Sequence, residues 1–450
     1  MIIKINIILF LFIIKNIKNI ILEFKRDYYK GNNNTFHFPE YFNNYISTKL
    51  CFGSNNQCLK LNIELNSYPL WLITSKSKSS NINQISFDQF SSETFYLKDT
   101  STHVYYHSKF SWTYFCYDIL TFQNYNIQDF FFLGVEIFEK NPINSGIIGF
   151  DLKFREKYFM PEINFINQLK RNKIINNYCF SFIYNKYNEN KREEGNLLIG
   201  ELPNKYLIQL ENKNLIYKNV IEVNDELKWG IEIEKVYVGN FKIENKTKIG
   251  FSIEHGVIIG SFEYKEYILK TFFDDLFKKE ICYSERFEDL FQGFVCNESL
   301  NYDNFENITF KIGKKEFIFS KDDLFIKNDR NKILFLIVFP SKDFYFTKID
   351  WTFGVPFFKK YIVVFNMDKK IVGYYLNIEL ANYEKYENTF YFMKKVSIFL
   401  FIIIIILVII LYFYSKTKPS KKNINDELTE KINNIESKKF KKIKKKVIYY

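Results

Sequence analysis

Short runs of alternating apolar and polar residues fill most of the chain between Cys51 and Leu380. Examples are residues 130–135, 197–200 and 235–239, and turn-forming Asn, Gly, Lys and Asp residues separate such runs. Apolar positions two residues apart lie on one face of a strand, and no long stretch repeats with the helical period. The pattern therefore predicts a mostly β body.

Two of these runs end in an acidic residue that is followed by a turn. Residues 61–63 lead into Glu64, and residues 251–253 lead into Glu254. A strand that ends in this way delivers a carboxylate to a loop at the end of a sheet. Two such copies predict a two-lobed protein with a pair of carboxylates, one from each lobe.

Two long apolar stretches lie near the ends of the chain. Residues 396–414 are 19 residues without a charge. At about 1.5 Å per residue, a helix of this length spans the hydrocarbon core of a bilayer, which favours a transmembrane helix over a buried core helix. The other stretch, residues 2–22, is interrupted by three lysines. It predicts a signal sequence over residues 1–24, with an uncleaved anchor as the alternative.

The net charge of +12 is concentrated after the predicted transmembrane helix. Residues 415–450 hold 12 lysines and 4 acidic residues, which leaves +4 for residues 1–414. This distribution excludes nucleic-acid binding by the body, and the positive-inside rule places the tail in the cytosol. The lysine run at residues 438–446 fits a solvated tail or a partner of anionic lipid. Because residues 416–450 lack apolar periodicity, we expect a disordered or weakly helical tail.

The cysteines and glycosylation sequons all precede the predicted transmembrane helix. The sequons begin at Asn33, Asn245, Asn297 and Asn307, and the cysteines are Cys51, Cys58, Cys116, Cys179, Cys282 and Cys296. Six cysteines in an oxidising compartment permit three bridges. We expect the two local pairs, Cys51–Cys58 and Cys282–Cys296, and assign the remaining two cysteines to each other. The spacings contain no CxxC and only four histidines are present, so we expect no metal and no cofactor.

Together these features predict a single-pass type I membrane protein of the secretory pathway, at the cell surface or in an endosomal or vacuolar membrane. Its body would be luminal or extracellular.

Several motifs in one order resemble the pepsin-like aspartic proteases over most of this body. Residues 53–57 stand where the family has Gly-Thr-Pro-Pro-Gln, and residues 146–150 resemble its apolar-apolar-Gly element. Residues 180–184 followed by 195–201 are similar to the segment that joins the lobes. Residues 351–366, continuing to 372–374, resemble the signature of the last lobe.

The resemblance implies a bilobal β fold with a substrate cleft between the lobes. The first lobe would span residues 51–185 and the second lobe residues 186–380. A lead-in over residues 25–50 would precede them, and a juxtamembrane segment over 381–395 would connect to the transmembrane helix at 396–414 and the tail at 415–450.

The residues at the family's catalytic positions differ from its Asp-Thr-Gly motifs. In the family, one Asp per lobe shares a proton with the other and activates the attacking water. Here the first motif is Glu64-Leu65-Asn66. The second aligns as Glu254-His255-Gly256 with a short deletion afterwards, whereas a gapless alignment puts Ser252 at the carboxylate position. A longer side chain displaces each carboxyl by about an ångström, an error that costs about 100-fold in rate.

The resemblance also implies substrate-binding positions. Tyr106 matches the family's flap Tyr, but His107 and Lys109 replace the flap glycines. With Tyr106 we place Trp71, His255 and Gly256 at the cleft, while core or flap packing is the alternative for Trp71 and Tyr106. A structural role is the alternative for both histidines.

Three hypotheses follow for the function. The first is a catalytically inactive homologue whose cleft binds an extended peptide or a protein partner. The second is an active aspartic-type endopeptidase that uses a Glu64/Glu254 dyad. The third is a structural surface protein with a closed cleft.

Overall fold

The computed structural model describes residues 20–27, 37–42, 45–76, 85–106, 109–138, 144–152, 163–185, 194–203, 215–223, 226–243, 246–287, 290–303, 305–328, 330–341, 349–375, 383–417 and 424–446. The chain forms two compact units, Met1–Ala381 and Asn382–Tyr450. The first unit, the body, is built mainly of strands, so the expected fold class is confirmed.

The largest sheet of the body has 13 strands in the order β11-β27-β26-β9-β10-β1-β2-β3-β8-β4-β7-β6-β5. The strands are β1 (Ile20–Asp27), β2 (Tyr45–Phe52), β3 (Gln57–Glu64), β4 (Leu70–Ile73), β5 (Tyr96–Tyr106), β6 (Lys109–Phe122), β7 (Tyr125–Phe138), β8 (Gly146–Gly149), β9 (Cys179–Tyr184), β10 (Glu194–Ile199), β11 (Leu215–Asn219), β26 (Ile362–Asn366) and β27 (Ile371–Tyr375). Strands from the start, middle and end of the body therefore lie side by side in one sheet.

Strand β1 overlaps the end of the expected signal sequence at residues 1–24. It pairs with β10 and β2, and Ile20, Leu22 and Phe24 are buried in the core. Cleavage after residue 24 would remove five of the eight residues of this strand from the sheet. Residues 1–19 lie outside the described part, so the signal sequence and the other domain boundaries stay predictions.

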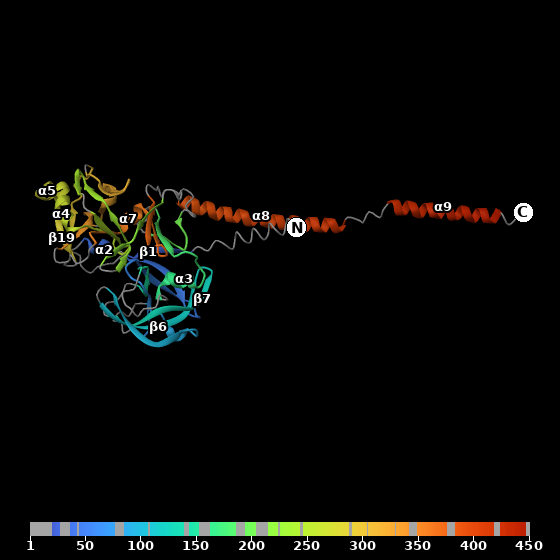
Figure 1. The fold of residues 1–450 in the computed structure, drawn as a ribbon, viewed down its shortest axis with the longest axis horizontal. Coiled ribbons are helices and arrows are strands. Elements are labelled where there is room, and N and C mark those ends of the chain that lie inside the picture. The colour runs from blue at the N-terminus through green and yellow to red at the C-terminus, as the bar shows by residue number, and fades with distance from the viewer. Residues whose placement is uncertain are drawn as a thin grey trace. The chain divides into compact units, whose positions relative to one another are not determined.

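The second half of the body adds sheets of eight, four and two strands. The eight-stranded sheet contains β14 (Gly230–Ile233), β17 (Thr247–Phe251), β18 (Ile258–Ile259), β19 (Cys282–Phe287), β20 (Phe291–Cys296), β23 (Phe325–Lys327), β24 (Ile333–Pro340) and β25 (Trp351–Phe353). The others contain β15 (Lys235–Val238), β16 (Phe241–Ile243), β21 (Ile308–Ile312) and β22 (Lys315–Phe319), and β12 (Ile221–Val223) with β13 (Glu226–Lys228). Figure 1 shows β6 and β7 in one part of the body, and α4, α5 and β19 in another.

The helices of the body are short and lie between strands. They are α2 (Pro39–Phe42), η1 (Gln89–Ser91), α3 (Phe165–Arg171), α4 (Phe262–Ile268), η5 (Leu269–Phe273), α5 (Asp274–Lys278), α6 (Lys321–Leu324) and α7 (Val355–Lys360). Two of them contact the candidate site described below, α2 and the start of α7, where Val355 N donates to the His255 oxygen at 2.8 Å.

Aromatic side chains join the two halves of the body. Phe180 stacks on Phe365 with ring centroids 4.9 Å apart, and Trp229 lies 5.1 Å from Phe365 at a steep angle. The Trp229 Nε1–H donates to the carbonyl oxygen of Phe150 at 2.7 Å, which satisfies the one polar group of this buried ring. The packing holds β8, β9 and β26 in one arrangement and so positions the loops that follow them.

Both local disulfides form as expected. Cys51 lies opposite Cys58 on the β2–β3 hairpin, and Cys282 lies opposite Cys296 on β19–β20. Such bridges indicate the lumen of the secretory pathway. The predicted Cys116–Cys179 bridge is wrong. These two cysteines are buried on β6 and β9, which are not neighbours in the sheet, and no bridge joins them.

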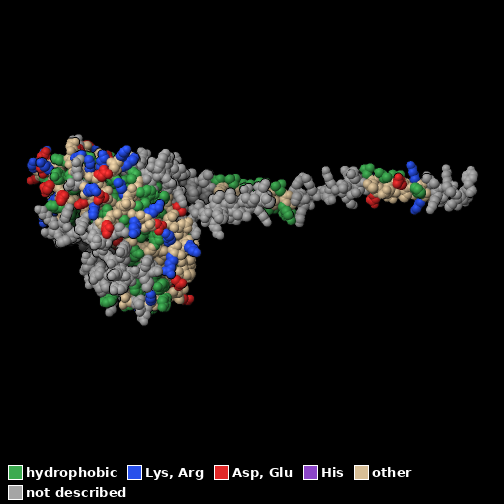
Figure 2. Space-filling model, viewed as in Figure 1, with side chains coloured by type: hydrophobic (Ala, Val, Ile, Leu, Met, Phe, Trp, Pro, Cys, Tyr) green, Lys and Arg blue, Asp and Glu red, His purple; other side chains and the backbone are tan. Residues whose placement is uncertain are grey.

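The second unit consists of α8 (Tyr383–Thr417) and α9 (Ile424–Lys446). Within the described residues, α8 is the one helix long and apolar enough to cross a membrane, through Val396–Phe413. Figure 2 shows hydrophobic side chains along its described surface. The helix extends beyond the expected span on both sides. The tail also differs from the expectation, because residues 424–446 form a helix with exposed apolar side chains.

Candidate active site

The first candidate loop follows β3. Glu64 ends this strand and lies opposite Gly149 in the parallel β3–β8 ladder. Its main-chain oxygen accepts a hydrogen bond from Phe150 N at 2.9 Å, and the residue is 8% exposed. A Cβ on Gly149 would overlap the carbonyl oxygen of Ser67, so only glycine lets the loop fold back over β8.

The second candidate loop follows β17 and repeats this arrangement. Phe251 lies opposite Phe353 in the parallel β17–β25 ladder, and Ser252 N donates to the Phe353 oxygen at 3.0 Å. The next residue, Gly354, takes the place of Gly149, because a Cβ there would overlap the carbonyl oxygen of Val257. In each lobe, one strand thus leads into a loop, and a glycine at or just after the end of the neighbouring strand packs against that loop.

The two registers identify which residues of the loops correspond. Glu64 lies opposite Gly149, and the β17–β25 register brings Ser252 opposite Gly354. Ser252 therefore corresponds to Glu64, and Glu254 corresponds to Asn66. This register favours the gapless alignment over the one that pairs Glu64 with Glu254. The position symmetric to the first carboxyl holds a hydroxyl.

The side chain of Glu254 joins the two loops. Its Oε1 accepts a hydrogen bond from Asn66 N at 3.0 Å, and its Oε2 accepts one from Ser252 Oγ at 2.5 Å. Asn66 Nδ2 lies 3.4 Å from the same Oε2. Burial raises the pKa of Glu254, and these hydrogen bonds oppose the rise only in part. The carboxyl is therefore used in contacts between the loops.

The middle residues of the loops are apolar in both lobes. Leu65 and Ile253 are fully buried. Leu65 stands at the Thr position of the family's first Asp-Thr-Gly motif, and Ile253 is its counterpart in the second loop by the ladder register. Here the contact between Asn66 and Glu254, one position later in each loop, connects the two loops.

A segment from the N-terminal part of the chain lies against the second loop. This docked segment, residues 37–42, includes α2. Gly256 N donates to the carbonyl oxygen of Phe42 at 3.1 Å, and the Phe42 ring lies 4.8 Å from that of His255. A Cβ on Gly256 would overlap the carbonyl oxygen of Tyr41. Gly256 is thus the place where the docked segment approaches the loop most closely.

Aromatic and acidic residues of the second lobe hold the docked segment. Phe38 is fully buried and stacks on Phe287 with ring centroids 5.2 Å apart. The start of the segment is fixed by Glu285, whose Oε1 accepts hydrogen bonds from His37 N at 2.7 Å and Phe38 N at 3.2 Å. A Cβ on Gly293 would overlap the ring of Phe38.

A cation from β1 lies beside the docked segment. Arg26 is 8% exposed, and its guanidinium lies 5.7 Å from the ring centroid of Tyr41. A side chain at Gly256 would also approach this guanidinium. The N-terminal part of the body therefore brings both the docked segment and a positive charge to the second loop.

The other expected cleft residues have different surroundings. Trp71 is 2% exposed and packs in an apolar cluster with Phe131, Leu133 and Ile147, as the packing alternative expected. Tyr106 ends β5 and pairs with Lys109 across the hairpin, but its side chain and His107 lie outside the described part. Of the expected cleft residues, His255 and Gly256 contact the docked segment.

The comparisons with known proteins agree with this architecture. The family model for eukaryotic aspartyl proteases matches residues 44–375, which include both loops. A search of curated proteins returns no match. The matched region is well over half of the chain, and its order of strands, paired loops and glycines is that of the expected bilobal fold. The chain belongs to the eukaryotic aspartyl protease family.

Proposed function

We propose that this protein is a catalytically inactive, pepsin-like binding protein. The observation that supports it most is the ladder register, in which a hydroxyl, Ser252, occupies the position symmetric to Glu64. A serine hydroxyl does not ionise at the pH where a carboxyl does, so this pair cannot share one proton as two carboxyls do. Glu254 is the nearest substitute, but its oxygens accept hydrogen bonds from both loops.

The cleft of this protein is proposed to bind a peptide with aromatic anchors. The docked segment supports this, because it uses a main-chain hydrogen bond at Gly256 and inserts Phe38 between Phe287 and Gly293. Main-chain bonds combined with side-chain pockets are a general way to recognise a peptide. A partner peptide of similar chemistry would compete with the docked segment for the same surface.

A peptide-binding measurement tests this proposal. A fluorescent peptide of residues 36–43 is titrated into the full chain and into Phe38→Ala, with folding of both checked by circular dichroism. We expect Phe38→Ala to bind the peptide, and the unaltered chain to bind it at least about tenfold more weakly, because its own segment is present at millimolar effective concentration. The same peptide with serine in place of the phenylalanines that correspond to Phe38 and Phe42 is the control. Failure of Phe38→Ala to bind would contradict peptide recognition and favour a closed structural protein.

The proposed topology is that of a type I membrane protein. A signal sequence in residues 1–24 would direct the body to the lumen or the cell exterior, α8 would span the membrane, and the basic tail would lie in the cytosol. The two disulfides and the apolar helix support this arrangement. The final membrane would be the cell surface or an endosomal or vacuolar membrane.

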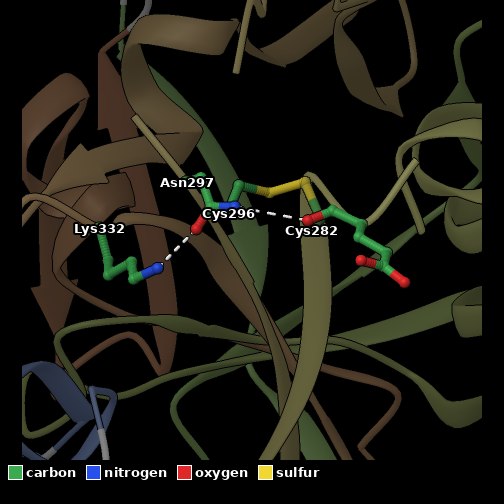
Figure 3. Close-up of a disulfide and its surroundings, with 5 residues drawn as sticks. Cys282, Cys296, Asn297 and Lys332 are labelled. Carbon is green, nitrogen blue, oxygen red and sulfur yellow. Dashed lines mark hydrogen bonds between the residues drawn. A yellow bond between two sulfur atoms is a disulfide. The ribbon is translucent and has the colours of Figure 1, made fainter. Parts of the chain in front are cut away.

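The sequons differ in how well they can accept a glycan, which leads to a prediction. Asn297 adjoins the Cys282–Cys296 disulfide, and both ends of its amide are engaged (Figure 3). Its Nδ2 donates to the Glu280 oxygen at 3.4 Å, and its Oδ1 accepts from Lys332 Nζ. The side chain of Asn307 is exposed. Asn33 and Asn245 lie outside the described residues.

We therefore expect a glycan on Asn307 and none on Asn297. Asn307→Gln should lower the mass of the expressed protein by one glycan, whereas Asn297→Gln should leave the glycan mass unchanged. Intact-mass measurement before and after enzymatic deglycosylation distinguishes the two. The opposite pattern would show that modification precedes formation of the Asn297 contacts.

A further inference from the structure

The helix α9 has an exposed apolar stripe among its described side chains. Leu428, Ile432, Ile435 and Phe440 are each at least half exposed. At about 100° per residue, the first three lie within an arc of roughly 60° on the helix surface. Asp426, Glu427 and Glu430 fall on the opposite half. The first part of α9 is therefore amphipathic.

The second part of α9 is strongly basic. Residues 438–446 contain seven lysines and no acidic residue. Figure 2 shows lysine side chains gathered at the C-terminal end of the described side chains of α9. Phe440 stands within this run and is 74% exposed. A basic run that contains an exposed aromatic residue is typical of helices that lie in the interface of an anionic membrane.

The position of α9 in the chain places it close to a bilayer. The candidate transmembrane segment of α8 ends at Phe413, the helix ends at Thr417, and α9 begins at Ile424. Six residues lie between the helices, and a fully extended connection of this length reaches at most about 25 Å. Residues 414–417, the end of α8 beyond the candidate span, add about 6 Å, so if α8 spans a membrane the start of α9 lies within about 31 Å of its surface.

We propose that α9 lies along the surface of an anionic membrane next to α8. Its apolar stripe would enter the headgroup region, and the lysines at residues 438–446 would bind lipid phosphates and carboxylates. Long lysine side chains can lie beside an apolar stripe while their ammonium groups reach the headgroups. This inference does not depend on whether the cleft is catalytic.

Pairing of α9 with a second copy fits these residues less well. Lys439 falls on the line of Leu428, Ile432 and Ile435, so the stripe is interrupted after about two turns. A parallel pair would also bring two runs of seven lysines together, which repel each other. An anionic bilayer instead neutralises this charge.

Hydrogen–deuterium exchange of the full chain in nanodiscs tests the proposal. One set of discs contains phosphatidylcholine alone, and the other contains added phosphatidylserine. We expect amides of residues 428–446 to exchange at least about tenfold more slowly in the anionic discs, and high salt to reverse most of this protection. Equal exchange in the two lipids would overturn the proposal. Protection that requires two chains per disc would show helix pairing instead.

Two pairs of matched variants identify the contacts. Ile432→Gln with Ile435→Gln should abolish the protection, whereas Asn433→Gln with Asn434→Gln, on the polar side, should retain it. Changing lysines 438, 439, 441 and 442 to Gln should reduce protection strongly, while changing the same four to Arg should preserve it. Protection that survives both the Ile changes and the Gln changes would contradict the proposed contacts.

Discussion

Replacing Phe38 by Ala is expected to lower the free energy of unfolding of the body by about 3–5 kcal/mol. The Phe38 ring is fully buried, stacks on Phe287 and fills the space left by Gly293. Truncation leaves a cavity in a cluster that also contains Val257, Val295 and Leu334. Chemical denaturation followed by circular dichroism measures the change.

The effect of Phe38→Ala should include release of the docked segment. Hydrogen exchange at residues 37–42 should accelerate, because the segment loses the side chain that anchors it beside Glu285. Phe90→Ala is the matched control, since Phe90 is 75% exposed and its truncation should change stability by no more than about 0.5 kcal/mol. If Phe38→Ala behaves like this control, the docked segment does not pack as described.

Glu254→Gln is expected to remove the part of the pH dependence of stability that comes from this buried carboxyl. Burial raises the pKa of Glu254 above its ordinary value of 4.5, so between that value and the folded pKa the folded protein holds a proton that the unfolded chain has released. The contribution of Glu254 is therefore fully present below pH 4.5 and is lost as the pH rises through the folded pKa. Over this range the free energy of unfolding falls by at most about 1.4 kcal/mol per pH unit because of Glu254.

The comparison of the unaltered and Glu254→Gln proteins reports the loss of this one ionisable group. Glu64, Arg26 and His255 lie on the surrounding elements and are present in both proteins. Glutamine can still accept from Asn66 N and bond with Ser252 Oγ. Urea denaturation from pH 4 to 8 should show the Gln variant gaining stability over the unaltered protein as the pH rises. Exposed Glu266→Gln should give no such gain, and parallel curves for Glu254→Gln would contradict burial of a protonated carboxyl.

Features with a strong local signal could be predicted from the sequence. The charge-free stretch from Val396 identifies the apolar helix, and alternation of apolar residues identifies the β body. The two local disulfides follow because each pair lies directly opposite on one hairpin. Cys116 and Cys179 do not lie opposite each other on a hairpin. The predicted bridge between them, made because they were the two remaining cysteines, was wrong.

The candidate site needed three-dimensional information. Sequence similarity favoured Glu254 as the second carboxyl because it is the residue of the right chemical type, whereas the β17–β25 ladder favours Ser252. The docked segment was missed because its contacts join residues about 248 positions apart, such as His37 and Glu285. The pair Phe38 and Phe42 at helical spacing was its only sequence signal. The apolar stripe of α9 was hidden by the surrounding lysines.

The central claim is that the paired loops no longer form a proteolytic dyad. The most direct test is cleavage of a mixed peptide library by the purified chain from pH 3 to 7, with Phe38→Ala included so that the docked segment cannot mask activity. Glu64→Gln and Glu254→Gln are assayed beside them. We expect no cleavage by any of the four folded proteins. Cleavage by the unaltered chain or by Phe38→Ala that disappears in both Gln variants would contradict the account and establish a Glu64/Glu254 dyad.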